Sequence, residues 1–201
     1  MPRARAVEDS TLLPALLAAF WRRGYAGTGI RELEAASGLK APSLYHRFGS
    51  KDAAFEAVLA HYIEVVVGQR VQHYLRAKDP ARGLRAFFES TYAHEHSPLG
   101  CLLVNSAIEP GSLQSGISAQ LARGRRIIFD ELRANLSRAQ ADGLLEASAD
   151  LDALAGALQL GLTGLLVGCR ARLARSSLEQ QTRGLLALLP WTRTAKRKDL
   201  P

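Results

Sequence analysis

Apolar residues recur at helical spacing along almost the whole chain, and no stretch shows sustained alternation of apolar and polar positions between hairpin turns. This pattern predicts an all-α fold. The first expected helix runs over 13–23, with Leu16 and Phe20 on its inner face and Gly24 at its end. Because Pro14 is best accommodated in a first turn, this helix is expected to begin late or to bend there.

Two further short helices are expected at 29–36 and 41–48, the first with Thr28 as its N-cap and the second with Pro42 in its first turn. The tight turn between them is centred on Gly38, which can adopt the positive φ that most residues resist. Three short helices, the last two joined by a three-residue glycine turn, match the helix-turn-helix unit, whose last helix enters the major groove of DNA.

A longer helix follows over 51–75, with Ser50 as its N-cap. Beyond it, helices are expected at 81–94, 102–108, 117–141, 151–175 and 178–189. The chain is therefore predicted to comprise an N-terminal three-helix helix-turn-helix domain (1–50), a C-terminal helical domain (51–190) and a short basic tail (191–201).

The charge is unevenly distributed over the chain. The 201 residues hold 26 Lys and Arg against 19 Asp and Glu, a formal net charge of +7. Residues 1–51 contribute +4, residues 52–190 are neutral, and residues 191–201 contribute +3. Two basic ends on a neutral body favour an anionic partner such as nucleic acid, although a merely solubilising tail remains an alternative for the last eleven residues.

The third short helix and its flanks carry the groups that DNA recognition requires. Cations suit phosphates, hydroxyl and imidazole groups suit hydrogen bonds, and an aromatic ring can lie against the backbone. The residues concerned are Lys40, Ser43, Tyr45, His46, Arg47 and Lys51. Each of them singly fits an ordinary solvated surface or a core edge, but together on this scaffold they favour a nucleic-acid interface.

Three stretches, Phe20 to Tyr25, Thr28 to Leu33 and Gly38 to Asp52, resemble the DNA-binding domain of the TetR/AcrR family of transcriptional regulators, down to the terminal Leu-Tyr-x-x-Phe-x-x-Lys pattern. The resemblance implies a cytoplasmic homodimer that binds a palindromic operator in double-stranded DNA, usually as a repressor. It also implies a variable C-terminal domain that binds a small-molecule effector and thereby releases the DNA.

The resemblance further assigns roles to single positions. It places phosphate contacts on Thr28, Tyr45 and Lys51, and base-reading positions on Arg31, Lys40, Ala41, Ser43, His46 and Arg47. Two residues depart from the family pattern. Glu34 stands where Ala is common, so its side chain must reach solvent or a cation, and Lys40 replaces the usual capping hydroxyl.

Small residues form a stripe on the helix expected at 151–175, namely Ala157, Gly161, Gly164 and Gly168. Glycines inside a helix cost about 1 kcal/mol each relative to Ala, so a close helix–helix contact is expected to offset them. The resemblance implies that this contact is the dimer interface, and the alternative is packing within one subunit. The apolar run over 160–169 is too short to span a membrane, so no membrane association is expected.

The stretch over 100–109 resembles the start of a central helix that lines the effector cavity in one branch of the family. The candidate pocket residues are Phe87, Phe88, Tyr92, Cys101, Asn105 and Gln159. Aromatic residues at helical spacing are equally compatible with plain core. Cys101 allows an alternative mechanism, a thiol-based sensor of oxidants or electrophiles, against which stands the simpler interpretation of a small buried residue.

No motif indicates an enzyme. The chain lacks a Gly-rich phosphate loop, a nucleophile elbow, a metal-binding helix motif and a paired-carboxylate arrangement. The spacing of His94, His96 and Cys101 matches no defined zinc pattern, so neither a metal nor a cofactor is predicted. Two cysteines and the absence of an apolar leader before Glu8 favour a reducing compartment.

Overall fold

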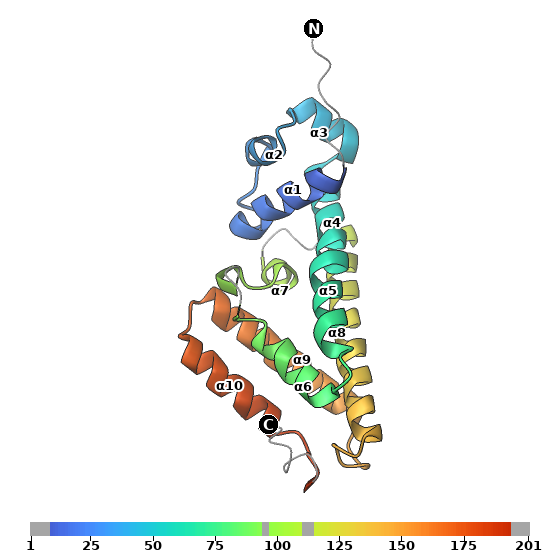
Figure 1. Ribbon diagram of the computed structural model, residues 1–201. Coiled ribbons are helices and arrows are strands. Elements are labelled where there is room, and N and C mark those ends of the chain that lie inside the picture. Colours follow the sequence, from blue (N-terminus) through green and yellow to red (C-terminus); the bar gives the residue numbers. More distant parts are fainter. Residues whose placement is uncertain (1–8, 94–96, 110–114, 194–201) are drawn as a thin grey trace.

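The computed structural model describes residues 9–93, 97–109 and 115–193. Over these residues the chain forms helices joined by short turns and contains no strand, only an isolated antiparallel bridge between Leu145 and Trp191. The predicted all-α class is therefore confirmed. Figure 1 shows a small N-terminal group of helices at one end of a larger helical body, with one long helical run extending from the first part into the second.

The N-terminal part comprises α1 (Asp9–Arg23), α2 (Ile30–Ser37) and α3 (Ala41–Phe48). Helix α1 begins four residues earlier than expected and contains Pro14 in its interior. A proline there removes one backbone hydrogen bond, but Leu12 and Leu16 on either side of it are fully buried and hold the helix in place.

The cap of α2 also differs from the expected one. Gly29, not Thr28, is the N-cap, and its backbone N–H donates to Oε2 of Glu32 at 2.9 Å. At the other end of α2, Gly38 has φ +71° and its N–H donates to the Glu34 carbonyl, which closes the helix as predicted.

The long helix expected over 51–75 is present but not uniform. Helix α4 (Lys51–Tyr62) continues through a π-helical turn (Ile63–Val67), the single turn α5 (Gly68–Arg70) and a second π-helical turn (Val71–Leu75). The side chain of Ser50 caps α4 by accepting from the N–H of Ala53 at 3.1 Å.

The body contains α6 (Pro80–Glu89), a 3₁₀ turn (Ser97–Leu99), α7 (Leu102–Ala107), α8 (Ser115–Ala141), α9 (Leu151–Arg170) and α10 (Arg175–Ala187). Two predicted helix ends were wrong. Helix α6 stops at residue 89 because the hydroxyls of Ser90 and Thr91 donate back to the carbonyls of Phe87 and Phe88. Helix α9 stops at residue 170 because Arg172 adopts a left-handed conformation with φ +58°, which also lets α10 begin at residue 175.

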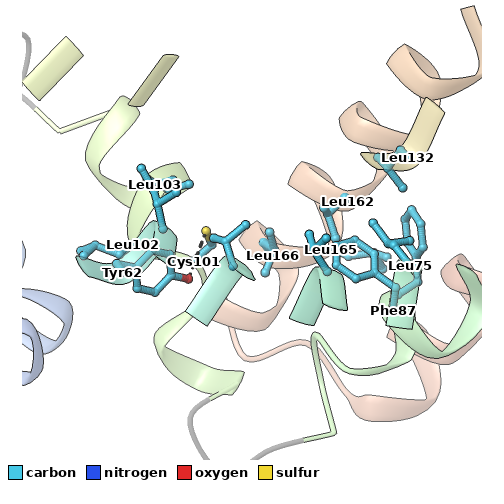
Figure 2. Packing of buried hydrophobic residues seen from close by; sticks show 14 of the residues in the cluster. Tyr62, Leu75, Phe87, Cys101, Leu102, Leu103, Leu132, Leu162, Leu165 and Leu166 are labelled. Carbon is cyan, nitrogen blue, oxygen red and sulfur yellow. Dashed lines mark hydrogen bonds between the residues drawn. The ribbon is translucent and has the colours of Figure 1, made fainter. Parts of the chain in front are cut away.

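One apolar core runs through both parts of the molecule. Phe20 of α1 and Phe55 of α4 are fully buried, with ring centroids 4.7 Å apart. Further along, Tyr62, Phe87 and Leu162 pack with the buried leucines of the body (Figure 2).

The residues beyond α10 do not all belong to a separate tail. Trp191 is buried, and its indole N–H donates to the Leu186 carbonyl at 2.8 Å. The backbone N–H of Thr192 donates to the Leu144 carbonyl at 2.9 Å. The expected boundary at residue 191 therefore falls inside folded structure, and the basic residues 196–198 lie outside the described residues.

Candidate nucleic-acid interface

Helix α3 stands at the outer end of the N-terminal part (Figure 1) and is anchored by a single buried side chain, Leu44. Most of its other side chains are accessible to solvent: Ser43, Tyr45, His46 and Arg47 are exposed, as is Lys40 at its N-cap. Tyr45 is half exposed, which is unusual for a large aromatic residue. The predicted base-reading and phosphate-binding residues of this helix therefore share one accessible surface.

The N-terminus of α3 is held by a residue of α2. Lys40, the N-cap, makes no side-chain cap hydrogen bond. Instead, Oε1 of Glu34 accepts from the backbone N–H of Ala41 at 2.7 Å. The two departures from the family pattern thus compensate each other, because Glu34 supplies from the neighbouring helix the acceptor that Lys40 cannot supply, and its negative charge lies at the positive end of α3.

A second group flanks α3 at the start of α4. The ammonium group of Lys51 lies 4.2 Å from the ring centroid of Tyr25, and the Tyr25 hydroxyl donates to Oδ1 of Asp52. Burial, together with the hydrogen bond and negative charge of Asp52, raises the pKa of Tyr25 to about 12. Tyr25 thus stays protonated and positions Lys51 beside α3.

Two further predicted DNA contacts lie outside α3. Arg31 is exposed on α2. Thr28 is fully buried, and its hydroxyl donates to the Gly24 carbonyl at 2.6 Å. The Thr28 side chain is therefore a structural element of the turn between α1 and α2, and its hydroxyl is not presented to a phosphate.

The predicted effector-pocket residues are scattered over the body. Phe87, Phe88 and Tyr92 are buried around α6, with the two phenylalanine rings edge to face at 6.0 Å. The Asn105 amide donates to the Leu99 carbonyl and borders a hollow of about 290 Å³ between α1 and α7. Gln159 lies elsewhere, because its amide bridges α9 to the Arg125 carbonyl of α8 at 2.6 Å.

Cys101 is the N-cap of α7 and is buried, with 4% of its surface exposed. Its sulfur accepts from the Tyr62 hydroxyl at 3.4 Å (Figure 2). A thiol that senses oxidants or electrophiles must be accessible to them, so this geometry does not favour the thiol-sensing alternative. Burial also raises the pKa of the Cys169 thiol.

The small-residue stripe of α9 divides into two faces. Side chains added at Gly161 and Gly168 would strike Leu185 and Leu178 of α10, so these glycines allow close packing of α9 on α10 within one chain. Ala157 and Gly164 instead face outward, and an added Cβ at Gly164 would meet nothing within 4 Å.

By length and composition alone, helix α9 could cross a membrane. Its apolar stretch is longer than the ten residues, 160–169, that the sequence indicated. Its inner face, which includes Leu158, Leu162 and Leu165, is buried in the core. One such helix is weak evidence and does not indicate a membrane protein.

Three functional candidates escaped the sequence analysis. Glu34 was recognised as unusual, but its partner was not. Neither Glu109 nor Arg70 was assigned a role of its own, because the groups that they contact are distant in sequence: 83 and 84 residues away for Glu109, and 17 and 20 residues away for Arg70.

Comparisons with known proteins agree with this geometry. Residues 12–58 match the family model of bacterial regulatory proteins of the tetR family, and residues 80–185 match that of the tetracyclin repressor-like C-terminal domain. The chain is 27% identical over 193 residues to the HTH-type transcriptional repressor ComR of Escherichia coli (strain K12), covering 94% of this chain and 91% of ComR. It is 30% identical over 178 residues to the transcriptional regulator AcuR of Cereibacter sphaeroides, covering 86% of this chain and 81% of AcuR. A solved structure of a cysteine mutant of the regulator CifR complexed with 26-bp double-strand operator DNA is similar, with TM-score 0.83 and 30% identity, covering 94% of this chain and 100% of that one.

The cap on α3 leads to a stability prediction. Glu34→Ala removes the acceptor of the Ala41 N–H and is expected to lower the free energy of unfolding by about 1 kcal/mol, as loss of a helix cap usually does. Glu34→Gln keeps an acceptor oxygen and should lose less. Urea unfolding of both variants measures this difference, and equal losses would show that the hydrogen bond contributes nothing.

Proposed function

The chain belongs to the tetR family of bacterial regulatory proteins and is a DNA-binding transcriptional regulator, and from this we propose that it acts as a homodimeric repressor released from its operator by a small molecule. The observation that carries the proposal is the exposed face of α3, with its cation, hydroxyl, phenol and imidazole groups, presented by a helix-turn-helix unit. The helical body behind it supplies the surfaces for dimerisation and effector binding.

On DNA, α3 enters the major groove with its N-terminal turn toward the bases. Lys40, Ala41 and Ser43 lie in that turn and read base edges, with Arg31, His46 and Arg47 beside them. Tyr45 and Lys51 contact phosphates, which fix the register of the helix without reading sequence. Thr28 is omitted from these contacts because its hydroxyl is buried in the turn between α1 and α2.

The role of Lys51 can be tested by salt dependence. Lys51→Ala is expected to weaken binding to every DNA sequence and to reduce the slope of log K against log salt by about one unit per protomer. The reason is that binding releases one fewer counterion from the DNA for each phosphate contact that the variant lacks. Fluorescence anisotropy over a range of salt concentrations measures the slope. Lys78→Ala is the matched control, since Lys78 is exposed in the turn that precedes α6, and an equal change of slope in both variants would remove Lys51 from the interface.

A face of α9 and α10 offers the dimer interface. Leu160 of α9 and Leu188, the C-cap of α10, are 77% and 81% exposed, far more than leucines of a monomer core. Gly164 and Gly184 are also exposed, with open space where a side chain would stand. An apolar face with small residues allows two copies of the helix pair to pack closely as a four-helix bundle.

Selection from random double-stranded DNA tests both the operator and the dimer. The wild-type protein is expected to select an inverted repeat and to run at about twice the 21.8 kDa of one chain in light scattering. Leu160→Glu places a charge in the apolar interface and should give monomers that no longer bind the inverted repeat. Ala134→Glu, on the exposed surface of α8, is the control, and a site without two-fold symmetry contradicts the homodimer.

The two parts of the chain are joined by polar contacts that an effector could alter. Glu109, just beyond α7, accepts from the backbone N–H groups of Tyr25 at 2.9 Å and Ala26 at 2.6 Å. Gly24, with φ +76°, makes room for this carboxylate, which would lie 2.7 Å from an added Cβ. The Trp21 indole N–H also donates to the Gly100 carbonyl at 3.2 Å. Movement of α7 therefore displaces the turn between α1 and α2.

This connection predicts a local change in amide exchange. In Glu109→Ala the amides of Tyr25 and Ala26 lose their acceptor and should exchange at least about tenfold faster, which corresponds to loss of a hydrogen bond of about 1.4 kcal/mol. Operator affinity should change as well, because the orientation of α3 depends on this turn. Hydrogen–deuterium exchange measures the first effect, and Glu146→Ala, in a surface turn, is the control. Unchanged exchange at both amides would contradict the coupling.

A further inference from the structure

Arg70 is a cation that points into the body from α5. Its Nε donates to the Ser90 hydroxyl at 3.2 Å, and its Nη2 donates to the same hydroxyl at 2.9 Å and to the Phe87 carbonyl at 3.0 Å. The centre of the guanidinium group lies 4.7 Å from the centroid of the Phe87 ring. These contacts fix the group in one orientation, and every partner is neutral.

No carboxylate among the described residues forms an ion pair with Arg70. Burial lowers the pKa of its guanidinium, and the groups whose charges act on it are phenols and thiols, namely Tyr62, Cys101, Tyr74 and Cys169. Other arginines of the body do have carboxylate partners at the surface, for example Arg85 with Glu89 at 2.8 Å and Arg175 with Glu179 at 2.9 Å. Arg70 is only partly exposed, and a cation that loses part of its hydration without gaining a counter-ion is unfavourable for folding, so its presence calls for a functional explanation.

Space for a counter-ion exists beside this group. An open, solvent-facing hollow of about 850 Å³ follows the helical run from Glu64 to Tyr74, and Arg70 contributes to its lining. Within the described part of the chain, Nη1 of Arg70 donates to no protein group, so one nitrogen of the guanidinium has no acceptor. Glu64 also lines the hollow, but its side chain is exposed to solvent and is not paired with Arg70.

We propose that Arg70 binds the carboxylate of an acidic organic effector, with Tyr74, which also lines the hollow, beside it for the apolar part of the molecule. The proposal rests on the effector-released repressor described above and names the chemical class of its effector. A guanidinium group suits a carboxylate because its N–H groups lie in one plane and match the two oxygens. Neutral hydroxyls such as that of Ser90 orient the guanidinium without neutralising it, which leaves its charge for the ligand.

Thermal unfolding at constant ionic strength tests the site with benzoate and hexanoate, with benzamide and hexanamide as neutral counterparts, and with inorganic phosphate. A carboxylate at tenfold its Kd should raise the melting temperature of the wild-type protein by about 3–6 °C. The amides should not. A shift with phosphate alone would replace the organic acid by an inorganic anion and overturn the proposal.

Variants show whether Arg70 is responsible. Arg70→Met keeps the length of the side chain, removes the charge and should abolish the shift, while its own melting temperature without ligand should equal or exceed that of the wild type. Arg70→Lys keeps the charge and should retain part of the shift. Arg126→Met, on the exposed face of α8, is the matched control and should respond like the wild type. Equal shifts in Arg70→Met and wild type, or no shift with either carboxylate, overturn the proposal.

Operator binding measured with the same compounds separates this proposal from the function on which it rests. If the amides release the operator and Arg70→Met responds equally, the effector-released repressor stands and the role of Arg70 fails. If the carboxylates bind through Arg70 without changing operator affinity, the anion site stands and effector release fails.

Discussion

The helical run over residues 51–75 is the element on which the rest of the structure depends, because both parts of the molecule bury their apolar side chains against it. Near its start, Phe55 packs on Phe20 of α1. Further along, Val67 and Leu75 are buried in the body. Since this helical run contributes to the one core that both parts share, a tilt of the run in the body moves the helix-turn-helix unit at its end.

Polar contacts contribute less free energy than this apolar packing but are directional. Burial of a large apolar side chain contributes about 1.5–3 kcal/mol, whereas a single hydrogen bond contributes about 1 kcal/mol net. The apolar core therefore holds the two parts together. The directional contacts of Glu109 with the α1–α2 turn, and of Glu34 with the start of α3, set how α3 is oriented.

The same division explains how well the sequence predicted each feature. Helix positions came from apolar periodicity and were correct for α2, α3 and the run over 51–75 to within a residue or so. The end of α9 was placed five residues too late, because a left-handed turn at Arg172 cannot be anticipated from a residue that rarely adopts it. Thr28 was assigned to DNA by its motif, yet its hydroxyl is buried in a turn whose geometry no motif specifies.

The sequence by itself determined the fold class, the family and the exposed face of α3, because periodicity and short motifs are local and can be read from neighbouring residues. Only the tertiary structure decided which long-range polar pairs form. Glu34 was expected to find solvent or a cation and found a backbone N–H, and Arg70 was found without a carboxylate partner among the described residues. Such pairs depend on where separate helices meet in space, and that depends on how all the apolar faces pack at once.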